Sequence, residues 1–324
     1  MRRVRYHQYG GPEVLTTEEA DVPTPGQGQV LLRAEAIGAN FVDTRFRRGA
    51  PAGSVFHRPL PGILTGDVVG TVEAVGPGVA EDLLGRRVGA LAEDACAEFV
   101  LADAAWLAPV PDGLDLGAAS MLPMGAPVAL GALRTGRLAA GETVLVHAGA
   151  GGIGHLAVQS AKLLGAATVI ATAGSKAKLD FVRELGADVA VDYTDADWPE
   201  QVRAAAPQGV DLVLDSVGGT VLHRSLEVLA PLGRVVVYGA ADGEPGSVPV
   251  MPLFGLRAVV GFSLIAWRTA RPDLARRDIE ESTEHFASGR LRTAVHARLP
   301  LAETATAHRL LEERSNLGRI LLLP

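Results

Sequence analysis

The first 110 residues contain short strand-like runs of apolar residues, and glycine and proline interrupt them repeatedly. Runs of this length between turn-forming residues are typical of β-strands. The predicted strands are Gln29–Ile37, Asp67–Val75, Arg86–Ala90 and Ala97–Leu101. This part of the chain is therefore predicted to form a β-rich unit.

From about Thr143 to Phe262, strand-like runs alternate with segments of helical periodicity. Two predicted helices end at glycines, Gly165 and Gly186, which are natural residues at a helix C-terminus. The predicted strands begin at Thr143 and then cover Thr168–Thr172, Val189–Asp192, Val210–Asp215 and Arg234–Tyr238; the helices cover Ile153–Leu164, Lys176–Leu185 and Val221–Leu229. This alternation predicts an α/β fold with a parallel, doubly wound sheet. The tail is predicted to add helices at Asp273–Ser288 and Ala302–Arg314 and strands at Val295–Leu299 and Arg319–Leu323.

The first strand of the alternating region runs straight into a glycine-rich turn, with the sequence T-V-L-V-H-A-G-A-G-G-I-G over Thr143–Gly154. A strand, a turn almost without side chains and a helix N-terminus together form an anion site, because backbone N–H groups and the helix dipole converge there. We therefore predict that a dinucleotide pyrophosphate is bound by Ala148, Gly151, Gly152, Ile153 and Gly154. The alternative is a tight turn without a ligand, which any α/β protein can contain.

The residues after the second strand of this region distinguish NAD from NADP. An NAD site usually places an acidic residue about 20 residues after the glycines, where it binds the ribose 2′-hydroxyl. Here Ser175, Lys176 and Lys178 follow the strand, and the first acidic residue, Asp180, comes later. Two of the chain's three lysines lie in this turn, and a 2′-phosphate requires cations and hydroxyl donors. The sequence therefore predicts NADPH as the cofactor; the alternative is an ordinary solvated helix start.

Composition restricts the partners and the compartment. A length of 324 residues fits two domains. The formal charge of −7 argues against a nucleic-acid partner, because binding to phosphates needs a basic surface. No apolar segment has the length of a signal peptide or a membrane span, and a single cysteine, Cys96, suits a reducing compartment. We expect a cytoplasmic protein in which Cys96 is a small buried side chain.

Four motifs occur in the order in which one enzyme family carries them. They are G-A-N-F-V-D-T-R at Gly38–Arg45, G-D-V-V-G-T-V-E-A-V-G-P-G-V at Gly66–Val79, L-V-H-A-G-A-G-G-I-G at Leu145–Gly154 and G-A-D-V-A-V-D-Y at Gly186–Tyr193. From end to end the chain resembles the zinc-independent medium-chain dehydrogenase/reductases, specifically quinone oxidoreductases and ζ-crystallin-like proteins. The resemblance implies a GroES-like β-rich catalytic domain at residues 1–120 and 266–324, with an inserted Rossmann cofactor domain at residues 121–265. It also implies a homodimer, for which we expect the apolar strand Arg234–Tyr238 to pair across a two-fold axis.

The same resemblance predicts that the chain binds no zinc. Zinc-dependent relatives carry a cysteine ligand at the place of Asn40 and a histidine ligand at the place of Gly66. Catalytic zinc needs about three nitrogen, sulfur or oxygen ligands, and the structural zinc of those relatives needs four cysteines. This chain has one cysteine, and its eight histidines show no metal-ligand spacing. His147, beside the glycine turn, is expected to be structural rather than an acid.

Without zinc, hydride transfer needs an acceptor whose developing negative charge is stabilised. A quinone or a conjugated enone meets this need, because the charge reaches an oxygen that solvent can protonate. By resemblance, Asn40 lies near the nicotinamide and donates its amide N–H to a substrate oxygen; the alternative is a turn-forming residue at a strand end. Asp43 either orients that loop or is purely structural. By resemblance, Ser175, Lys178 and Tyr193 lie at the 2′-phosphate, and for Tyr193 the alternative is packing after a strand.

Two single positions and one short segment differ from the relatives near the expected substrate pocket. Arg45 replaces a tyrosine of many relatives, residues 126–129 replace a Thr-Ala-Tyr-like segment, and Pro51 falls where polyketide enoyl reductases can carry a tyrosine linked to product stereochemistry. The pocket is therefore expected to be reshaped. The alternatives to a quinone or enone reductase are an enoyl-thioester reductase of polyketide or fatty-acyl metabolism and a non-catalytic, crystallin-like NADPH-binding protein.

Basic residues gather in a loop-like stretch that the resemblance places at the entrance of the substrate cleft. They are Arg45, Arg47, Arg48, His57 and Arg58. In an otherwise acidic protein this cluster predicts attraction of an acidic substrate. The alternative is a solvated, arginine-rich surface.

Overall fold

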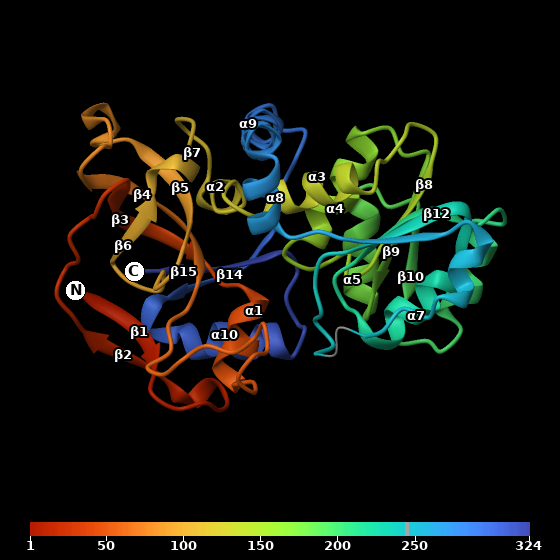
Figure 1. Ribbon diagram of the computed structural model, residues 1–324, viewed down its shortest axis with the longest axis horizontal. Coiled ribbons are helices and arrows are strands. Elements are labelled where there is room, and N and C mark those ends of the chain that lie inside the picture. The colour runs from red at the N-terminus through yellow and green to blue at the C-terminus, as the bar shows by residue number, and fades with distance from the viewer. Residues whose placement is uncertain (244–245) are drawn as a thin grey trace. The chain divides into compact units, whose positions relative to one another are not determined.

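The computed structural model of the chain describes residues 1–243 and 246–324. It divides into two compact units: unit 1 comprises Met1–Gly125 and Ile279–Pro324, and unit 2 comprises Ala126–Asp278. Unit 1 is therefore built from both ends of the chain, coloured red to yellow and dark blue in Figure 1. The divisions between the units follow Gly125 and Asp278, whereas the sequence-based divisions followed residues 120 and 265.

Unit 1 is centred on a β-sheet. Its residues are all described, and six strands follow one another in the order β14-β15-β3-β4-β5-β7, while β6 pairs with β3. The strands are β3 (Gln29–Gly38), β4 (Gly66–Val75), β5 (Arg87–Ala92), β6 (Phe99–Asp103), β7 (Ala108–Pro109), β14 (Val295–Pro300) and β15 (Arg319–Leu323). The C-terminal strand β15 pairs antiparallel with β3, so both ends of the chain share one sheet. The predicted strands of this unit are confirmed to within two residues at each end.

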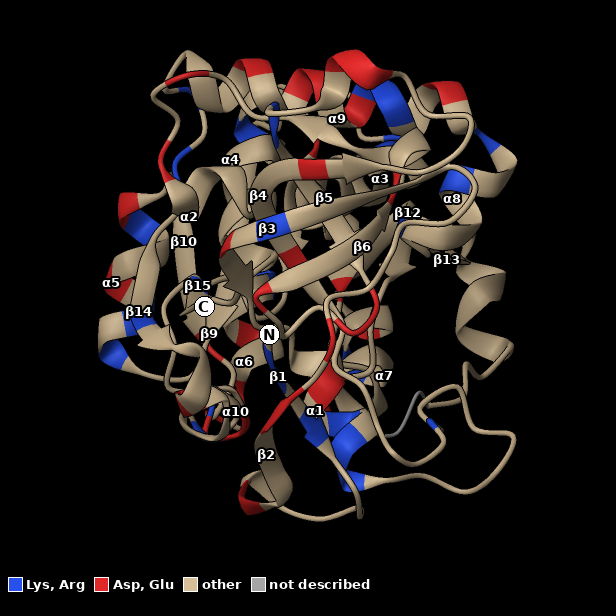
Figure 2. Cartoon of the chain, turned by 90° about the vertical axis from the view of Figure 1, so that its left-hand side faces the viewer, with Lys and Arg blue, Asp and Glu red and all other residues tan. Residues whose placement is uncertain are grey.

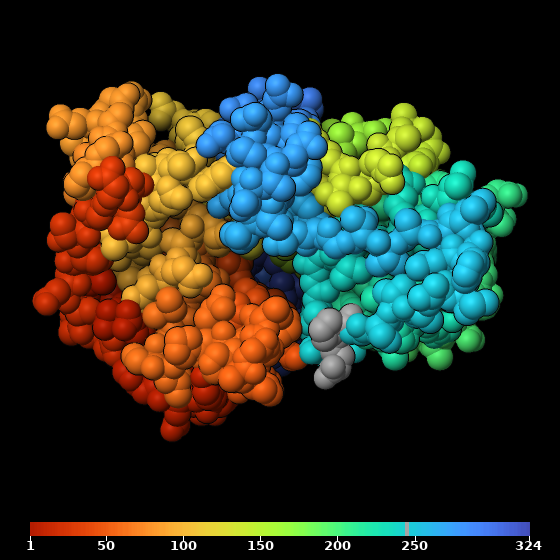
Figure 3. Space-filling model, in the orientation of Figure 1, coloured from red at the N-terminus to blue at the C-terminus, as the bar shows by residue number. Residues whose placement is uncertain are grey.

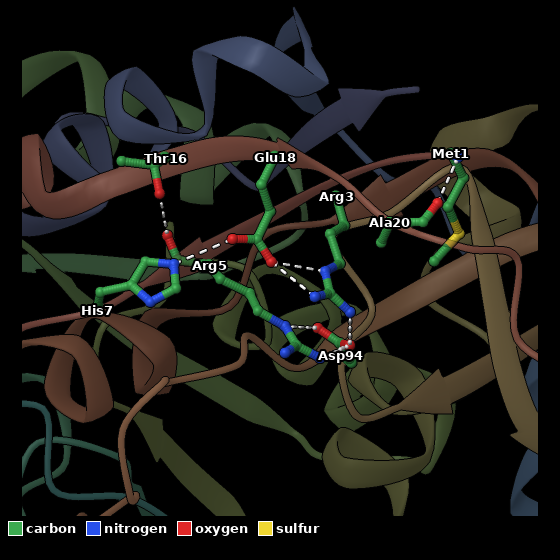
Figure 4. A network of polar contacts seen from close by, with 8 residues as sticks. All are labelled: Met1, Arg3, Arg5, His7, Thr16, Glu18, Ala20 and Asp94. Atoms are coloured by element: carbon green, nitrogen blue, oxygen red, sulfur yellow. Dashed lines mark hydrogen bonds and ion pairs between the residues drawn. The ribbon is translucent and has the colours of Figure 1, made fainter.

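A two-stranded sheet at the start of the chain was not predicted. It consists of β1 (Arg2–Tyr6) and β2 (Leu15–Glu19), which the short helix η1 (Pro12–Val14) connects. In Figure 4, Arg3 donates from Nε to Oε1 of Glu18 over 2.8 Å, and its guanidinium lies 3.9 Å from Asp94. The amide of Val4 donates to the carbonyl of Cys96 over 2.8 Å. Because such partly exposed ion pairs contribute little, the main attachment of this hairpin to the unit is the burial of Val4, Tyr6 and Val14 in its apolar core.

Short helices complete unit 1. They are α1 (Phe41–Arg48), α2 (Leu116–Ala119), α10 (Thr304–Glu312), η2 (Glu81–Leu83), η3 (Ala104–Trp106) and η5 (Leu301–Glu303), while α9 (Pro272–Ala287) crosses the division between the units. The loop-like stretch predicted around Arg45 is wrong over its first part, because α1 forms there and buries Asp43, Phe46 and Arg47. Cys96 is buried in the core, as predicted. Among the described residues, no helix has the length and hydropathy needed to span a bilayer.

Unit 2 contains the predicted parallel sheet. In residues 126–243 and 246–278, six parallel strands follow the order β10-β9-β8-β11-β12-β13. The strands are β8 (Thr143–Val146), β9 (Thr168–Ala173), β10 (Val189–Asp192), β11 (Val210–Asp215), β12 (Leu229–Val237) and β13 (Ala258–Gly261). The prediction of a parallel sheet from the βα alternation is confirmed.

Unit 2 also contains helices. They are α3 (Gly125–Thr135), α4 (Gly154–Leu163), α5 (Lys176–Glu184), α6 (Trp198–Ala205), α7 (Gly219–Glu227), α8 (Leu264–Ala270) and the short η4 (Met251–Gly255). Trp198 and Leu222, from α6 and α7, join Leu145 and Ile170 of the sheet in one apolar cluster. Strands with covered faces are expected to be apolar throughout, which explains the continuous apolar runs in the sequence.

One strand of this sheet differs from its prediction in length and position. β12 begins at Leu229 rather than Arg234, because Leu229 already pairs with Val210 ahead of an irregularity in the strand register. The segment Arg234–Val237 lies between β11 and β13 and has no free edge. The expectation that this strand pairs across a two-fold axis is therefore wrong, and β13 is the strand at this side of the described sheet.

Candidate functional site

The glycine-rich turn connects β8 to α4 in unit 2. Ala148 adopts a left-handed conformation with φ of +50°, and this turns the chain directly after the strand. A Cβ at Gly154 would lie 2.1 Å from the carbonyl oxygen of Ala148, so the helix can begin this close to the turn only with glycine there. A Cβ at Gly149 would lie 2.9 Å from the side chain of Ala171 on β9. Both glycines are needed for close packing of the turn.

The turn also presents unused hydrogen-bond donors. Within the described part of the chain, the amides of Gly152, Ile153 and Gly154 donate to no carbonyl, because the first amide bonds of α4 are those of His155 and its successors. Free amides at a helix N-terminus, together with the positive end of the helix dipole, bind phosphate oxygens. The residues present therefore fit the pyrophosphate of a dinucleotide.

The residues predicted to bind a 2′-phosphate gather where β9 and β10 end. Ser175 caps α5, and its hydroxyl accepts a hydrogen bond from the amide of Lys178 over 3.4 Å. A Cβ at Gly174 would lie 2.8 Å from the hydroxyl of Tyr193, so this tyrosine lies against the turn after β9. The structure thus brings Ser175, Lys178 and Tyr193 into one region of unit 2.

The nearest acidic residue in α5 does not provide an unpaired carboxylate. Asp180 accepts from Nζ of Lys176 over 3.1 Å and from Arg183 over 2.9 Å. These contacts lower the pKa of its carboxyl, and the Lys176 hydrogen bond is the largest cause. Lys176 is thereby engaged within its own helix.

His147 lies behind the turn and is structural, as expected. It is buried, and its ring nitrogens contact the hydroxyls of Thr172 over 3.0 Å and Ser225 over 2.8 Å. Burial lowers the pKa of this imidazole to about 4. The ring therefore stays neutral and holds β8, β9 and α7 together.

In unit 1, Asn40 directly precedes α1 and is only 7% exposed. Its Oδ1 accepts a hydrogen bond from Nη1 of Arg319 over 2.9 Å, whereas its Nδ2 has no partner among the described residues. The side chain makes no capping bond to α1, while the backbone carbonyl of Asn40 accepts from the amide of Asp43 over 3.3 Å, as a turn-forming residue after a strand would. Because a buried amide without a partner is costly, Nδ2 is a candidate donor to a ligand.

Arg319 was missed by the sequence analysis, although it determines how Asn40 presents its amide. Its guanidinium forms a buried ion pair with Asp67, and a Cβ at Gly38 would lie 1.5 Å from its Nη2. Since an arginine only donates, it selects the oxygen of the Asn40 amide and directs the nitrogen away. Gly38, the glycine of the G-A-N motif, therefore leaves the space that the Arg319 guanidinium occupies. This glycine is the feature of the sequence that could have indicated a large side chain against it.

Asp43 lies one helical turn after Asn40 and connects α1 to the segment before β4. Its carboxylate accepts from the amide of Thr65 over 2.8 Å and from the Thr65 hydroxyl over 2.9 Å. Burial raises the pKa of this carboxyl to about 7, although the Thr65 bonds act in the opposite direction. These contacts attach α1 to the segment before β4, and both the orienting and the purely structural role of Asp43 are consistent with them.

The predicted cationic entrance is wrong for Arg47. This side chain is fully buried, donates to Nδ1 of His308 over 3.2 Å and forms an ion pair with Glu312. Arg48 pairs with the same glutamate over 2.9 Å, and the guanidinium of Arg58 lies 4.0 Å from the centre of an aromatic ring. Arg47 and Arg48 thus hold α1 against α10, although the Arg48 side chain remains 55% exposed.

Zinc does not fit the positions that carry its ligands in zinc-dependent relatives. Asn40 has its oxygen engaged by Arg319, and a Cβ at Gly66 would lie 2.7 Å from the side chain of Ile37. No group of three histidine, cysteine or acidic side chains suited to a metal occurs within residues 1–243 and 246–324.

Two family models match the chain. Residues 26–112 match the alcohol dehydrogenase GroES-like domain, and residues 152–278 match the model described as zinc-binding dehydrogenase. The chain is 36% identical to a 2-haloacrylate reductase of Burkholderia, over 98% of this chain and 97% of that protein. The GroES-like domain matches within unit 1, and the second model matches within unit 2, where the Rossmann-type sheet lies.

Two solved structures are similar over their whole length. A mycobacterial protein complexed with NADPH superposes with a TM-score of 0.92 at 36% identity, and Escherichia coli quinone oxidoreductase complexed with NADPH superposes with 0.90 at 30%; both alignments cover 100% of each chain. NADPH, the cofactor predicted from the sequence, is thus the cofactor bound in both neighbours. The fold, the family models and the full-length relatives agree: the chain belongs to the medium-chain dehydrogenase/reductase family.

Proposed function

We propose that this protein is an NADPH-dependent reductase that transfers a hydride to a quinone or a conjugated enone without zinc. The observation that carries the proposal is the buried Asn40 amide, whose Nδ2 has no partner among the described residues. The chain's relatives include a 2-haloacrylate reductase and a quinone oxidoreductase. Each of these names describes a conjugated acceptor, which supports the proposed reaction class.

The chain's own residues account for binding and for stabilisation of charge. NADPH supplies the hydride when it is bound. The amides of Gly152, Ile153 and Gly154 hold the pyrophosphate, and Ser175, Lys178 and Tyr193 hold the 2′-phosphate. Asn40 donates to the substrate oxygen on which negative charge develops, and Arg319 keeps the amide in the orientation required. Solvent then protonates the reduced product.

Asn40→Ala tests this assignment. Loss of one preorganised donor to a developing oxyanion typically lowers kcat by about 10²–10³. NADPH oxidation is measured with 1,4-naphthoquinone, cyclohexenone and a crotonyl thioester, and the NADPH dissociation constant of the variant serves as its control. Turnover of the thioester alone would assign the enoyl-thioester alternative, and no turnover with any acceptor would support the non-catalytic protein. A variant that keeps full activity would contradict the role of Asn40.

We also propose a homodimer, with β13 at its interface. Among the described residues this strand pairs with β12 alone, so its other edge is free for a second copy. The preceding segment, seen on the right of Figure 3, exposes apolar side chains: Val250, Met251, Phe254 and Leu256 are 66–75% exposed. Exposed apolar residues beside a free edge are typical of an interaction surface. The cytoplasmic location, which rests on the single cysteine, stays a prediction.

A further inference from the structure

The last turn of α1 carries three arginines, which appear as the blue end of this helix in Figure 2. Arg47 and Arg48 both pair with Glu312. Arg45 is half-buried, and within the described residues it has neither a hydrogen bond nor an ion pair. A partly buried cation without a counter-charge loses part of its hydration, and no ion pair compensates for this loss. Arg45 is therefore a cation available to a ligand.

Arg45 lies five positions after Asn40, a little more than one helical turn along α1. Phe41, Val42 and Arg45 form the half-buried side of α1, opposite the fully buried residues of the same helix. Five residues of helix span roughly 7 Å, and helical side chains lean toward the N-terminus, so an arginine reaches back over the preceding turn. A small ligand with an apolar body and an anionic end would bridge the guanidinium and the free amide of Asn40.

We propose that Arg45 binds a carboxylate of the substrate, so that the preferred acceptors are α,β-unsaturated carboxylic acids rather than neutral quinones. This inference rests on the proposed function and specifies its substrate class. A carboxylate is favoured over a phosphate-bearing thioester, because α1 offers a single unpaired guanidinium that matches a planar, singly charged group. The half-buried Val42 beside it suits the hydrocarbon part of a small acid.

The Arg45 guanidinium has a second role in the reduction of an unsaturated acid. The β-carbon of the acid gains the hydride from NADPH, and the electron pair of the C=C bond moves onto the α-carbon and the carboxylate. The α-carbon then takes a proton from water, so the double bond is reduced and NADPH is oxidised to NADP⁺. A carboxylate already carries negative charge and resists receiving more, and a neighbouring guanidinium offsets this resistance.

Arg45→Gln tests the proposal, and Arg48→Gln is the matched control, since it removes one charge from the same helix outside the proposed site. Crotonate, methyl crotonate and 1,4-naphthoquinone are compared as acceptors. Loss of one charge-assisted contact predicts that Arg45→Gln raises KM for crotonate about tenfold or more and changes the values for the ester and the quinone less than twofold. Arg48→Gln should change all three less than twofold.

A second measurement does not depend on turnover. Calorimetry with NADP⁺-saturated protein should show crotonate binding that Arg45→Gln weakens about tenfold and Arg45→Lys weakens less. Reduction of the quinone or the ester by wild-type protein, without reduction or binding of crotonate, would overturn this inference and leave the proposed function standing. Equal losses for crotonate and its ester in Arg45→Gln would overturn it as well. No reduction of any acceptor would refute the proposed function itself, and the calorimetry would still decide whether Arg45 binds a carboxylate.

Discussion

Lys178→Ala is expected to remove most of the preference for NADPH over NADH. Lys178 lies in the first turn of α5, beside Ser175 and near Tyr193, where β9 ends without an acidic residue. A charge-assisted contact to a phosphate contributes roughly 1.5–3 kcal/mol, which corresponds to at least tenfold in affinity. Because Lys178 is only half-buried, the lower end of this range applies, and we expect the NADPH dissociation constant to rise about tenfold.

The structure supplies a close control for this experiment. Lys176 lies two residues earlier, but its ammonium is paired with Asp180, so Lys176→Ala should change the NADPH affinity less than twofold. Titration calorimetry of both variants with NADPH and NADH measures the four changes directly. NADH has no 2′-phosphate, and its affinity should stay constant. Equal losses for both cofactors in Lys178→Ala, or equal losses in the two variants, would refute the phosphate-site assignment.

Three further results are expected. Since the folded pKa of Asp43 is raised from 3.8 to about 7, the folded state holds its proton more tightly than the unfolded chain, and the free energy of unfolding should fall by up to roughly 4 kcal/mol as the pH rises from about 4 to about 7. Urea unfolding between these pH values should show a smaller decline in the free energy of unfolding for Asp43→Asn than for the wild type. An equal decline would contradict the raised pKa of Asp43. Activity should survive EDTA treatment, and metal analysis finding one tightly bound zinc per chain, with activity lost on its removal, would contradict the argument from Asn40 and Gly66. Light scattering should give a dimer mass that Val260→Asp on β13 converts to a monomer mass; a dimer that survives this substitution would place the interface elsewhere.

Local patterns in the sequence predicted the elements that depend on local chemistry. The alternation of apolar strands with periodic helices gave the parallel sheet of unit 2, and the glycine turn gave the junction of β8 and α4. Gly165 and Gly186 end their helices with positive φ, as their positions after the apolar periodicity indicated. In each case the deciding interactions lie within a few residues of one another.

The features that were missed depend on contacts between distant residues. Arg319 meets Asn40 across 279 positions of the chain, and no local pattern shows that the arginine fixes the asparagine amide. Arg47 was interpreted as a solvated cation, because its partner Glu312 is 265 positions away. The free edge at β13 was missed for a related reason: its residues read as a short apolar run, and only its pairing with β12 identifies it as a strand.

The most direct test of the proposed reaction is to follow the hydride into the product. The protein is incubated with a conjugated acceptor and NADPH that carries deuterium at the transferred position of its nicotinamide C4, and NMR locates the label. Transfer to the conjugated position predicts deuterium on the β-carbon of a saturated product, with the carbonyl or carboxyl group intact. Deuterium on the former carbonyl carbon of an alcohol, or no reduced product with any quinone, enone or unsaturated acid, would contradict the account.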